Sequence, residues 1–438
     1  MANNIYYVED LVSGGATNTL TDDGSGLDWL IFRNANSGNS ISLAWWVDNG
    51  ISTQGEAIYF IGNVGSRLIV NGLIENVRGG TSDDWITGNE ANNILFGDAL
   101  ATGAGGNDTI SAGAGSDTVY GGAGNDDIGG ANDNDSLAGN AGDDTISGGD
   151  GADTLQGGAG ADSLSGGANE GDTVSYSTSG AGVRLSFTYG TTTFGAGGDA
   201  AGDHLNGFRD AIGSNFGDVI IDTVAGAVGF DYNANKFNGG LGGDRLTLGG
   251  GNDTGIGGGG NDTIFGGQGD DTIDGGGNDD LIQGNAGVDT LSGAAGSDNL
   301  DGGDGTDTLS GGAGNDTVAG GLGADMLSGD TGADVFVFTT VRHSNTAGGI
   351  DTITDFSHAQ HDRIDLSAID ANGTLAGDAA FHFLGTAAFS GAAAEVRIVA
   401  LSDGWKVLAD LDGDRSADFV LTLTGPTMPA LVAADFVL

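Results

Sequence analysis

A single large apolar residue returns every nine positions along two long stretches of the chain. In the first stretch, from Gly103 to Ser165, these residues are Ile110, Val119, Ile128, Leu137, Ile146, Leu155 and Leu164. In the second stretch, from Gly239 to Val337, they are Leu246, Ile264, Ile273, Ile282, Leu291, Leu300, Leu309, Val318, Leu327 and Phe336. Gly255 takes the apolar place in one unit, where we expect a local defect or an adjustment of register. Such a fixed period predicts stacked repeats.

An aspartate stands two residues before each apolar place. These aspartates are Asp108, Asp117, Asp126, Asp135, Asp144, Asp153 and Asp162, then Asp244, Asp253, Asp262, Asp271, Asp280, Asp289, Asp298, Asp307, Asp316, Asp325 and Asp334. The first part of each unit is rich in glycine, which can adopt the positive φ that other residues avoid. We therefore predict a six-residue turn and a three-residue strand with its apolar side chain inward. Two units would make one coil of an all-β fold, a parallel β-roll.

Composition narrows the classes of function. The chain has 438 residues, 89 of them Gly, with no Cys, and 12 basic against 61 acidic residues give a formal charge of -49. This charge argues strongly against nucleic-acid binding, because phosphate contacts need clustered Lys and Arg. No apolar run is long enough to cross a membrane. Met1 to Leu20 lacks the features of a cleaved secretory leader, so we expect export by a route that does not use the N-terminus.

The regular aspartates indicate a divalent cation between adjacent turns. One apolar side chain per nine residues is a thin core, so another interaction must stabilise the coil. Carboxylates and glycine carbonyls, without Cys or His, are the ligand set of Ca²⁺. The expected carbonyl ligands lie two residues before an Asp: Gly115, Gly124, Gly142, Gly151, Gly160, Gly242, Gly251, Gly260, Gly269, Gly287, Gly296, Gly305, Gly314 and Gly323. Without calcium the carboxylates repel one another, and we expect disordered arrays.

Two resemblances agree with this interpretation. Units such as Gly121-Gly-Ala-Gly-Asn-Asp-Asp-Ile-Gly129 resemble the repeats-in-toxin (RTX) consensus G-G-x-G-x-D-x-U-x, where U is large and apolar. From Phe338 onward the chain resembles the C-terminal part of serralysin-type metalloproteases, with Asp351-Thr-Ile-Thr-Asp-Phe356, Asp362-Arg-Ile-Asp-Leu366 and Asp435-Phe-Val-Leu438. The resemblance implies a calcium-binding β-roll, a C-terminal cap and an uncleaved type I secretion signal, and hence an extracellular protein.

The chain is expected to have five segments. They are 1–78, a β-rich cap or assembly segment; 79–171, a first RTX β-roll; 172–238, a β-insert with one stray repeat; 239–338, a second RTX β-roll; and 339–438, a serralysin-like cap with the secretion signal. Trp45 and Trp46 would pack in the first cap, or form an assembly contact or a sugar platform. Asp410, Asp412 and Asp414 could bind one further calcium ion or form a solvated turn.

Catalytic motifs are absent from the sequence. There is no H-E-x-x-H or G-x-S-x-G, and His358 and His361 are interpreted as a surface pair. We therefore predict no catalytic residues and no cofactor other than multiple Ca²⁺. The leading hypothesis is a secreted structural protein of the cell surface, in an S-layer, filament or matrix, that self-assembles with calcium. A calcium-dependent adhesin or polysaccharide-binding module is the alternative, and an enzyme with an unrecognised site is a third class. The expected partners are the type I secretion machinery, further copies of the chain and, in the alternative, a surface polysaccharide.

Overall fold

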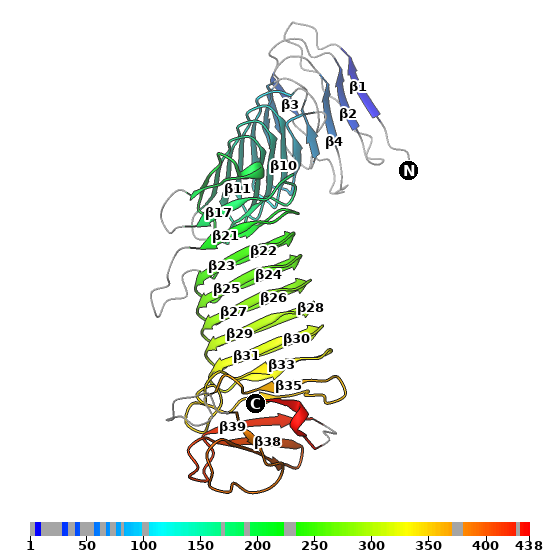
Figure 1. Cartoon of the computed structure of the whole chain (residues 1–438). Coiled ribbons are helices and arrows are strands. Elements are labelled where there is room, and N and C mark those ends of the chain that lie inside the picture. Colours follow the sequence, from blue (N-terminus) through cyan, green and yellow to red (C-terminus); the bar gives the residue numbers. More distant parts are fainter. Residues whose placement is uncertain are drawn as a thin grey trace. The chain divides into compact units, whose positions relative to one another are not determined.

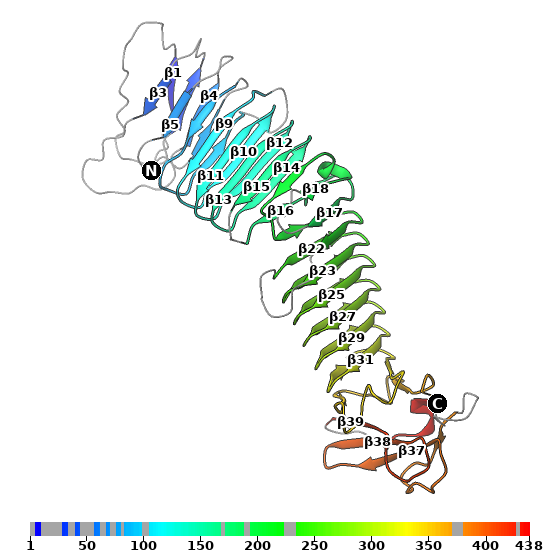
Figure 2. The same ribbon diagram turned by 90° about the vertical axis from the view of Figure 1, so that its left-hand side faces the viewer.

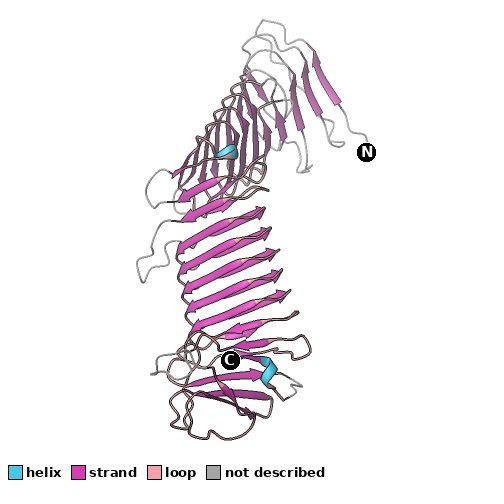
Figure 3. Ribbon diagram, viewed as in Figure 1, coloured by secondary structure: helices cyan, strands magenta, loops and turns pink. Residues whose placement is uncertain are grey.

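Two compact units of β-strands make up the chain, Met1–Ser214 and Asn215–Leu438 (Figure 1). The computed structural model describes residues 5–9, 29–33, 40–43, 57–61, 67–70, 76–79, 83–98, 105–167, 171–187, 193–222, 234–369, 380–425 and 430–438. Among these residues the helices are two single 3-10 turns, η1 (Gly198–Ala200) and η2 (Ala433–Asp435), which Figure 3 distinguishes from the strands. The all-β fold class is confirmed.

The first unit is a roll of two parallel sheets. One sheet contains, in order, β1 (Ile5–Glu9), β2 (Trp29–Arg33), β4 (Ala57–Ile61), β6 (Asn76–Arg78), β8 (Ile94–Phe96), β10 (Thr118–Ala123), β12 (Ser136–Ala141), β14 (Thr154–Ala159), β16 (Thr173–Ser175) and β20 (Asp210–Ile212). The other contains β3 (Ser40–Leu43), β5 (Arg67–Val70), β7 (Trp85–Thr87), β9 (Thr109–Gly113), β11 (Asp127–Asn132), β13 (Thr145–Asp150), β15 (Ser163–Gly167) and β19 (His204–Asn206), with β18 (Thr193–Phe194) antiparallel at its end. Strand β17 (Arg184–Phe187) lies between β16 and β18 in the chain. The described strands of residues 1–78 are therefore further rungs of this roll; Trp45 and Trp46 lie outside the described residues.

The second unit repeats this plan (Figure 2). One sheet contains β22 (Lys236–Leu241), β24 (Thr254–Gly259), β26 (Thr272–Gly277), β28 (Thr290–Ala295), β30 (Thr308–Ala313), β32 (Met326–Ser328) and β34 (Thr352–Ile353). The other contains β21 (Val219–Asp222), β23 (Arg245–Gly250), β25 (Thr263–Gln268), β27 (Leu281–Ala286), β29 (Asn299–Asp304), β31 (Thr317–Leu322), β33 (Val335–Val337), β35 (Arg363–Asp365) and β40 (Phe436–Val437).

The C-terminal region adds a second kind of sheet to the second unit. Strands β37 (Glu395–Ala400), β38 (Gly404–Asp410) and β39 (Phe419–Thr424) pair in antiparallel fashion. β36 (His382–Phe383) pairs with β37, and β39 also pairs in parallel with β34. The chain end returns to the roll, because β40 pairs with β35 and His358 Nδ1 lies 2.5 Å from Asp435 Oδ1. His358, which we interpreted as one of a surface pair with His361, also contacts Asp435.

Residues 172–238 contribute to both units. Strands β16, β19 and β20 extend the first roll, whereas β21 belongs to the second, where Ile220 pairs with Leu246. The stray repeat around Asp218 is therefore a rung of the second roll. Irregular spacing along the chain does not prevent regular stacking in space.

The strands are twice as long as predicted. Partners in neighbouring coils are eighteen residues apart, as in Ile264 with Ile282, which confirms two units per coil. However, a typical strand has six residues, as in Thr272–Gly277, so the three-residue prediction is wrong. Its second half contains glycines that were assigned to the turn. Gly276 has a left-handed φ of 101° and still pairs with Gly258, so positive φ bends the strand without ending it.

Gly255 causes no change of register. It pairs with Phe237 on one side and Ile273 on the other, in line with the rest of the roll. A Cβ on Gly255 would lie 3.0 Å from Leu248 Cδ1 and 3.2 Å from Ile264 Cγ2. The expected adjustment of register is wrong, because Leu248 of β23, in the other sheet, fills the space that an apolar residue at 255 would take.

Candidate metal centres of the two rolls

The repeat aspartates form four ladders inside the rolls. We name these ladder 1A (Asp108, Asp126, Asp144, Asp162), ladder 1B (Asp117, Asp135, Asp153), ladder 2A (Asp244, Asp262, Asp280, Asp298, Asp316, Asp334) and ladder 2B (Asp253, Asp271, Asp289, Asp307, Asp325). Within a ladder, Oδ1 of each Asp accepts the backbone N–H of the Asp one coil earlier: the N–H of Asp126 donates to Asp144 Oδ1 at 2.8 Å. All of these aspartates are buried.

The second carboxylate oxygen has no hydrogen-bond donor along most of each ladder. This holds for Oδ2 of Asp108, Asp117, Asp126, Asp135, Asp144, Asp162, Asp244, Asp262, Asp271, Asp280, Asp289, Asp298, Asp307, Asp316, Asp325 and Asp334. A buried carboxylate oxygen without a donor or a cation is strongly destabilising. The ladder geometry therefore requires a positive partner for these oxygens.

At many rungs, Oδ2 also lies beside a carbonyl oxygen, which is a second acceptor. A Cβ built on Gly139 would lie 2.0 Å from Oδ2 of Asp144 and 2.8 Å from the carbonyl oxygen of Gly157, one coil further on. The same geometry occurs at Gly266, whose Cβ would lie 2.4 Å from Oδ2 of Asp271 and 2.7 Å from the carbonyl oxygen of Gly284. Since only glycine leaves this space open, these rungs have a cradle lined by oxygen lone pairs, which is the environment of a hard cation.

The expected glycine ligands, two residues before most ladder aspartates, mostly have left-handed φ, as Gly142 (132°) and Gly314 (146°) do. A Cβ on Gly323 would lie 1.4 Å from the carbonyl oxygen of Gly305 and 3.1 Å from Oδ1 of Asp325. At this rung an expected carbonyl therefore lies on the Oδ1 side, whereas the carbonyls near Oδ2 come from glycines such as Gly157, which are not among the expected ligands.

Burial raises the pKa of the ladder carboxyl groups. The pKa values of Asp108, Asp144 and Asp271 are raised to about 8, first because burial disfavours the charged form. The like charges of the next coils add to the shift. A bound divalent cation acts in the opposite direction and favours the ionised form.

Further aspartates extend the ladders where the nine-residue spacing is lost. The N–H of Asp162 donates to Asp203 Oδ1 at 2.8 Å, that of Asp325 to Asp351 Oδ1 at 3.0 Å, and that of Asp334 to Asp362 Oδ1 at 3.2 Å. The nine-residue spacing does not predict these rungs, because the intervals before them are longer. The detectable signal is the triplet of Asp, any residue and an aliphatic residue, as in Asp203-His-Leu205 and Asp351-Thr-Ile353.

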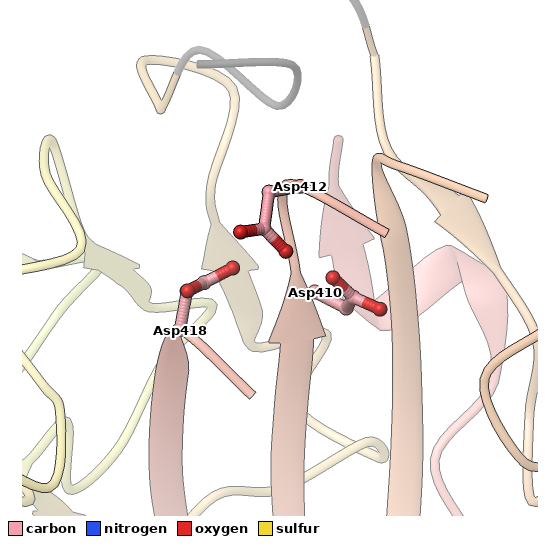
Figure 4. A group of neighbouring side chains, drawn as sticks. All are labelled: Asp410, Asp412 and Asp418. Atoms are coloured by element: carbon pink, nitrogen blue, oxygen red, sulfur yellow. The ribbon is translucent and has the colours of Figure 1, made fainter. Parts of the chain in front are cut away.

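The acidic cluster of the C-terminal region differs from the expected one (Figure 4). Carboxylate oxygens of Asp410, Asp412 and Asp418 lie within 4.8 Å of one another. Asp414 is not a member, and it accepts the N–H of Ser416 instead. Asp410 accepts two backbone N–H groups and Asp418 accepts one. Backbone donors therefore account for the positions of these two side chains.

Comparison with known families agrees with the ladders. The RTX calcium-binding nonapeptide repeat matches residues 71–99, 102–137 and 138–170, and the C-terminal region of the peptidase M10 serralysins matches residues 239–438. The chain carries RTX repeats and a serralysin C-terminal region. No protease domain is matched in it. RTX nonapeptides bind multiple Ca²⁺ ions, and such repeats indicate a calcium-binding secreted protein.

Other comparisons add little to the RTX assignment. Curated proteins gave no match to the chain. Among solved structures, the AlgE6R3 subunit of the mannuronan C5-epimerase from Azotobacter vinelandii is 29% identical, with 39% of this chain and 78% of that chain covered and a TM-score of 0.25. None of the described helices has the length and apolar character needed to cross a membrane.

Proposed function

We propose that this RTX chain is a secreted, non-catalytic structural protein of the cell surface, which folds and self-assembles on binding extracellular Ca²⁺. The observation that carries the proposal is the row of buried Oδ2 atoms without a hydrogen-bond donor, many of which lie beside carbonyl oxygens. In each cradle, a calcium ion would be held by ladder carboxylates and by glycine carbonyls of adjacent coils. The chemistry it supplies there is neutralisation of buried charge, so ion binding and folding become one process.

Export follows from the same coupling. Where free Ca²⁺ is scarce, the charged ladders oppose folding and keep the chain extended enough to be threaded. Outside the cell, millimolar Ca²⁺ favours the folded roll by mass action. The serralysin C-terminal region supports the type I secretion machinery as the partner in this step.

Self-assembly is supported by the ends and faces of the rolls. Among the described strands, β3 is the last of its sheet, and a terminal parallel strand offers backbone groups to another chain. Mid-roll faces are uniform: Thr272, Thr290 and Thr308 stack in register on successive strands and are exposed. The terminal edge of β3 would allow a second chain to add to the end of the roll. The threonine face would allow rolls to pack side by side.

The test is a calcium titration of the full chain followed by light scattering and negative-stain microscopy. We expect ordered sheets or filaments to appear as the chain folds. Ser42→Pro removes a backbone donor from β3 and should weaken assembly without changing the calcium midpoint, whereas Ser42→Ala keeps that N–H group and is the matched control. A folded chain that stays monomeric at millimolar Ca²⁺ would contradict the structural function.

Polysaccharide binding is the second candidate, favoured by one column of side chains on the first roll. Arg78, Phe96 and Tyr120 are in register on β6, β8 and β10. The rings of Phe96 and Tyr120 stack at 5.0 Å, and the Arg78 guanidinium lies 4.4 Å from the Phe96 ring centre. Tyr120 is exposed, and small Ala138 follows it in the column, so a sugar ring could stack beside it.

Affinity electrophoresis in calcium tests this second candidate. We expect retardation in a polysaccharide gel that Tyr120→Ala abolishes and the neighbouring Thr118→Ala does not. Equal migration of both variants and the unmodified chain in neutral and acidic polysaccharide gels would exclude this column as a sugar site.

A further inference from the structure

Tyr176 occupies a place that belongs to glycine elsewhere in the first roll. Four residues after Asp135 and Asp153 of ladder 1B stand Gly139 and Gly157, and four residues after Asp172 stands Tyr176. The register of β14 and β16 confirms the correspondence, since Leu155 pairs with Val174. Each of these glycines leaves room for Oδ2 of the next ladder Asp, as Gly139 does for Asp144. Tyr176 therefore projects a side chain into the space that forms a cradle in other coils.

The phenol fills this space and meets the last carboxylate of the ladder. The hydroxyl group of Tyr176 donates to Asp203 Oδ2 at 2.7 Å, and Asp203 Oδ1 accepts the N–H of Asp162 at 2.8 Å. Both residues are buried, with 1% and 0% of their surface exposed. Asp203 has a hydrogen-bond donor on each carboxylate oxygen, whereas Oδ2 of Asp144 and of Asp162 has none.

An O–H donor and a cation compete for the same lone pair. A hydroxyl group satisfies a buried carboxylate oxygen without adding charge, and the ring removes the volume that an ion and its carbonyl ligands need. We propose that Tyr176 closes ladder 1A, so that the rung between Asp162 and Asp203 holds no calcium. This inference rests on the proposed calcium ladders, and it adds the position at which ladder 1A ends.

Closure at this rung has a structural use. The chain leaves the regular coil between Tyr176 and Asp203, so the glycine turn that supplies carbonyl ligands in other coils is replaced by residues 177–202. A calcium ion at this rung, if the ring were absent, would take water in place of some carbonyl ligands. The tyrosine hydroxyl instead allows Asp203 to end the ladder with its hydrogen bonds complete.

Native mass spectrometry of the calcium-loaded full chain tests the proposal by counting bound ions. Tyr176→Gly reopens the cradle, and we expect one ion more than in the unmodified chain; adding Asp203→Asn should remove that extra ion. Tyr176→Phe keeps the ring and should leave the count unchanged. An unchanged count in Tyr176→Gly, or one ion fewer in Tyr176→Phe, would overturn the proposal, the second because the hydroxyl would then be a ligand.

A second comparison remains informative if Tyr176→Gly does not fold. In the unmodified chain, Asp203→Asn should leave the ion count unchanged, whereas Asp144→Asn should lower it by at least one. A loss of an ion in Asp203→Asn would show that the terminal rung is occupied and would refute closure. If the unmodified chain binds no calcium at all, the calcium ladders themselves are wrong, which is a different outcome from either result.

Discussion

Buried aspartates occur in the rolls and in the antiparallel C-terminal sheet, and their surroundings differ. In the sheet, Asp410 is fully buried, and both its oxygens accept backbone N–H groups, from Gly413 and Arg415. In the rolls, Oδ2 of Asp144 or Asp271 faces a carbonyl oxygen and has no donor. The sheet thus satisfies its buried acid from its own backbone, whereas the rolls need a partner from solution.

The antiparallel sheet also buries more apolar side chains per strand than the rolls do. Strands β37 to β39 bury several apolar side chains each, including Val396, Ile398, Val407, Leu421 and Leu423. A roll strand buries one aliphatic residue for each nonapeptide. Apolar burial is the main favourable term in folding, so the sheet needs less help from ions than the rolls do. Calcium dependence should therefore vary along one chain.

Removal of calcium is expected to have the largest effect. In excess chelator at neutral pH, amide hydrogen exchange in β24 to β31 should approach that of an unfolded chain, because adjacent ladder charges are no longer neutralised. Exchange in the β37–β38 hairpin should rise much less. Mass spectrometry of peptides after exchange resolves the two regions, and equal loss of protection in both would remove the distinction between them.

The pH dependence without calcium is the second largest effect and has opposite signs in the two regions. Burial raises the pKa of Asp108, Asp144 and Asp271 from 3.8 to about 8. Their contribution to stability is therefore complete below pH 3.8 and is lost as the pH rises through about 8. Hydrogen bonds from Ser390 lower the pKa of Glu395 in the sheet, so its contribution is present above pH 4.5 and is lost on acidification.

Circular dichroism in chelator from pH 3.5 to 8.5 measures this effect. We expect the β-roll signal to be strongest at the acid end and to fall toward pH 8.5, and added Ca²⁺ to restore it at high pH. Peptide-resolved exchange across the same range separates the sheet from the rolls. A roll signal that grows with pH in chelator would show that the ladders are not buried in the ion-free state.

Paired substitution within one ladder comes next. Asp271 and Asp289 lie in adjacent coils of ladder 2B. Asp271→Asn with Asp289→Asn keeps the size of both side chains and removes two anionic ligands. At about 1.4 kcal/mol for each tenfold change, loss of about 3 kcal/mol would raise the calcium midpoint roughly a hundredfold.

The two single variants and an exposed control complete this experiment. Asp274→Asn lies on β26 with its side chain exposed and should leave the midpoint unchanged. Because coils share ions in the proposed ladders, the double variant should differ from the sum of the single variants. Strict additivity would indicate independent sites.

The nine-residue pattern was enough to predict the roll, its two units per coil and the ladder aspartates. It could not predict the rungs at Asp203, Asp351 and Asp362, because loops of other lengths precede them while the coil closes in the same place. A residue belongs to a ladder because its carboxylate accepts the N–H of the Asp one coil earlier. A nine-residue spacing is one of several chain lengths that allow this hydrogen bond. The six-residue length of the strands could not be predicted, because glycine at positive φ usually indicates a turn. Gly258 and Gly276 instead pair within strands.

The compensation between Leu248 and Gly255 gives the smallest effect and tests how thin the roll core is. Gly255→Ala places a methyl group 3.0 Å from Leu248 Cδ1 and should cost about 1 kcal/mol through overpacking. In a Leu248→Ala background the same change should be neutral or favourable. The control is Gly129→Ala, where a Cβ meets nothing within 4 Å. Thermal midpoints in saturating calcium measure the cycle, and the same cost in both backgrounds would disprove the compensation.

The most direct test of the calcium ladders is a single titration at pH 7.5 in which bound calcium and β-structure are measured on the same samples. Equilibrium dialysis with radioactive calcium gives the number of ions bound, and far-ultraviolet circular dichroism gives the fraction of roll formed. We predict that both rise together, cooperatively, with many ions bound per chain and with no folding in Mg²⁺ alone. A full β-roll signal in chelator, before any ion is bound, would contradict the account.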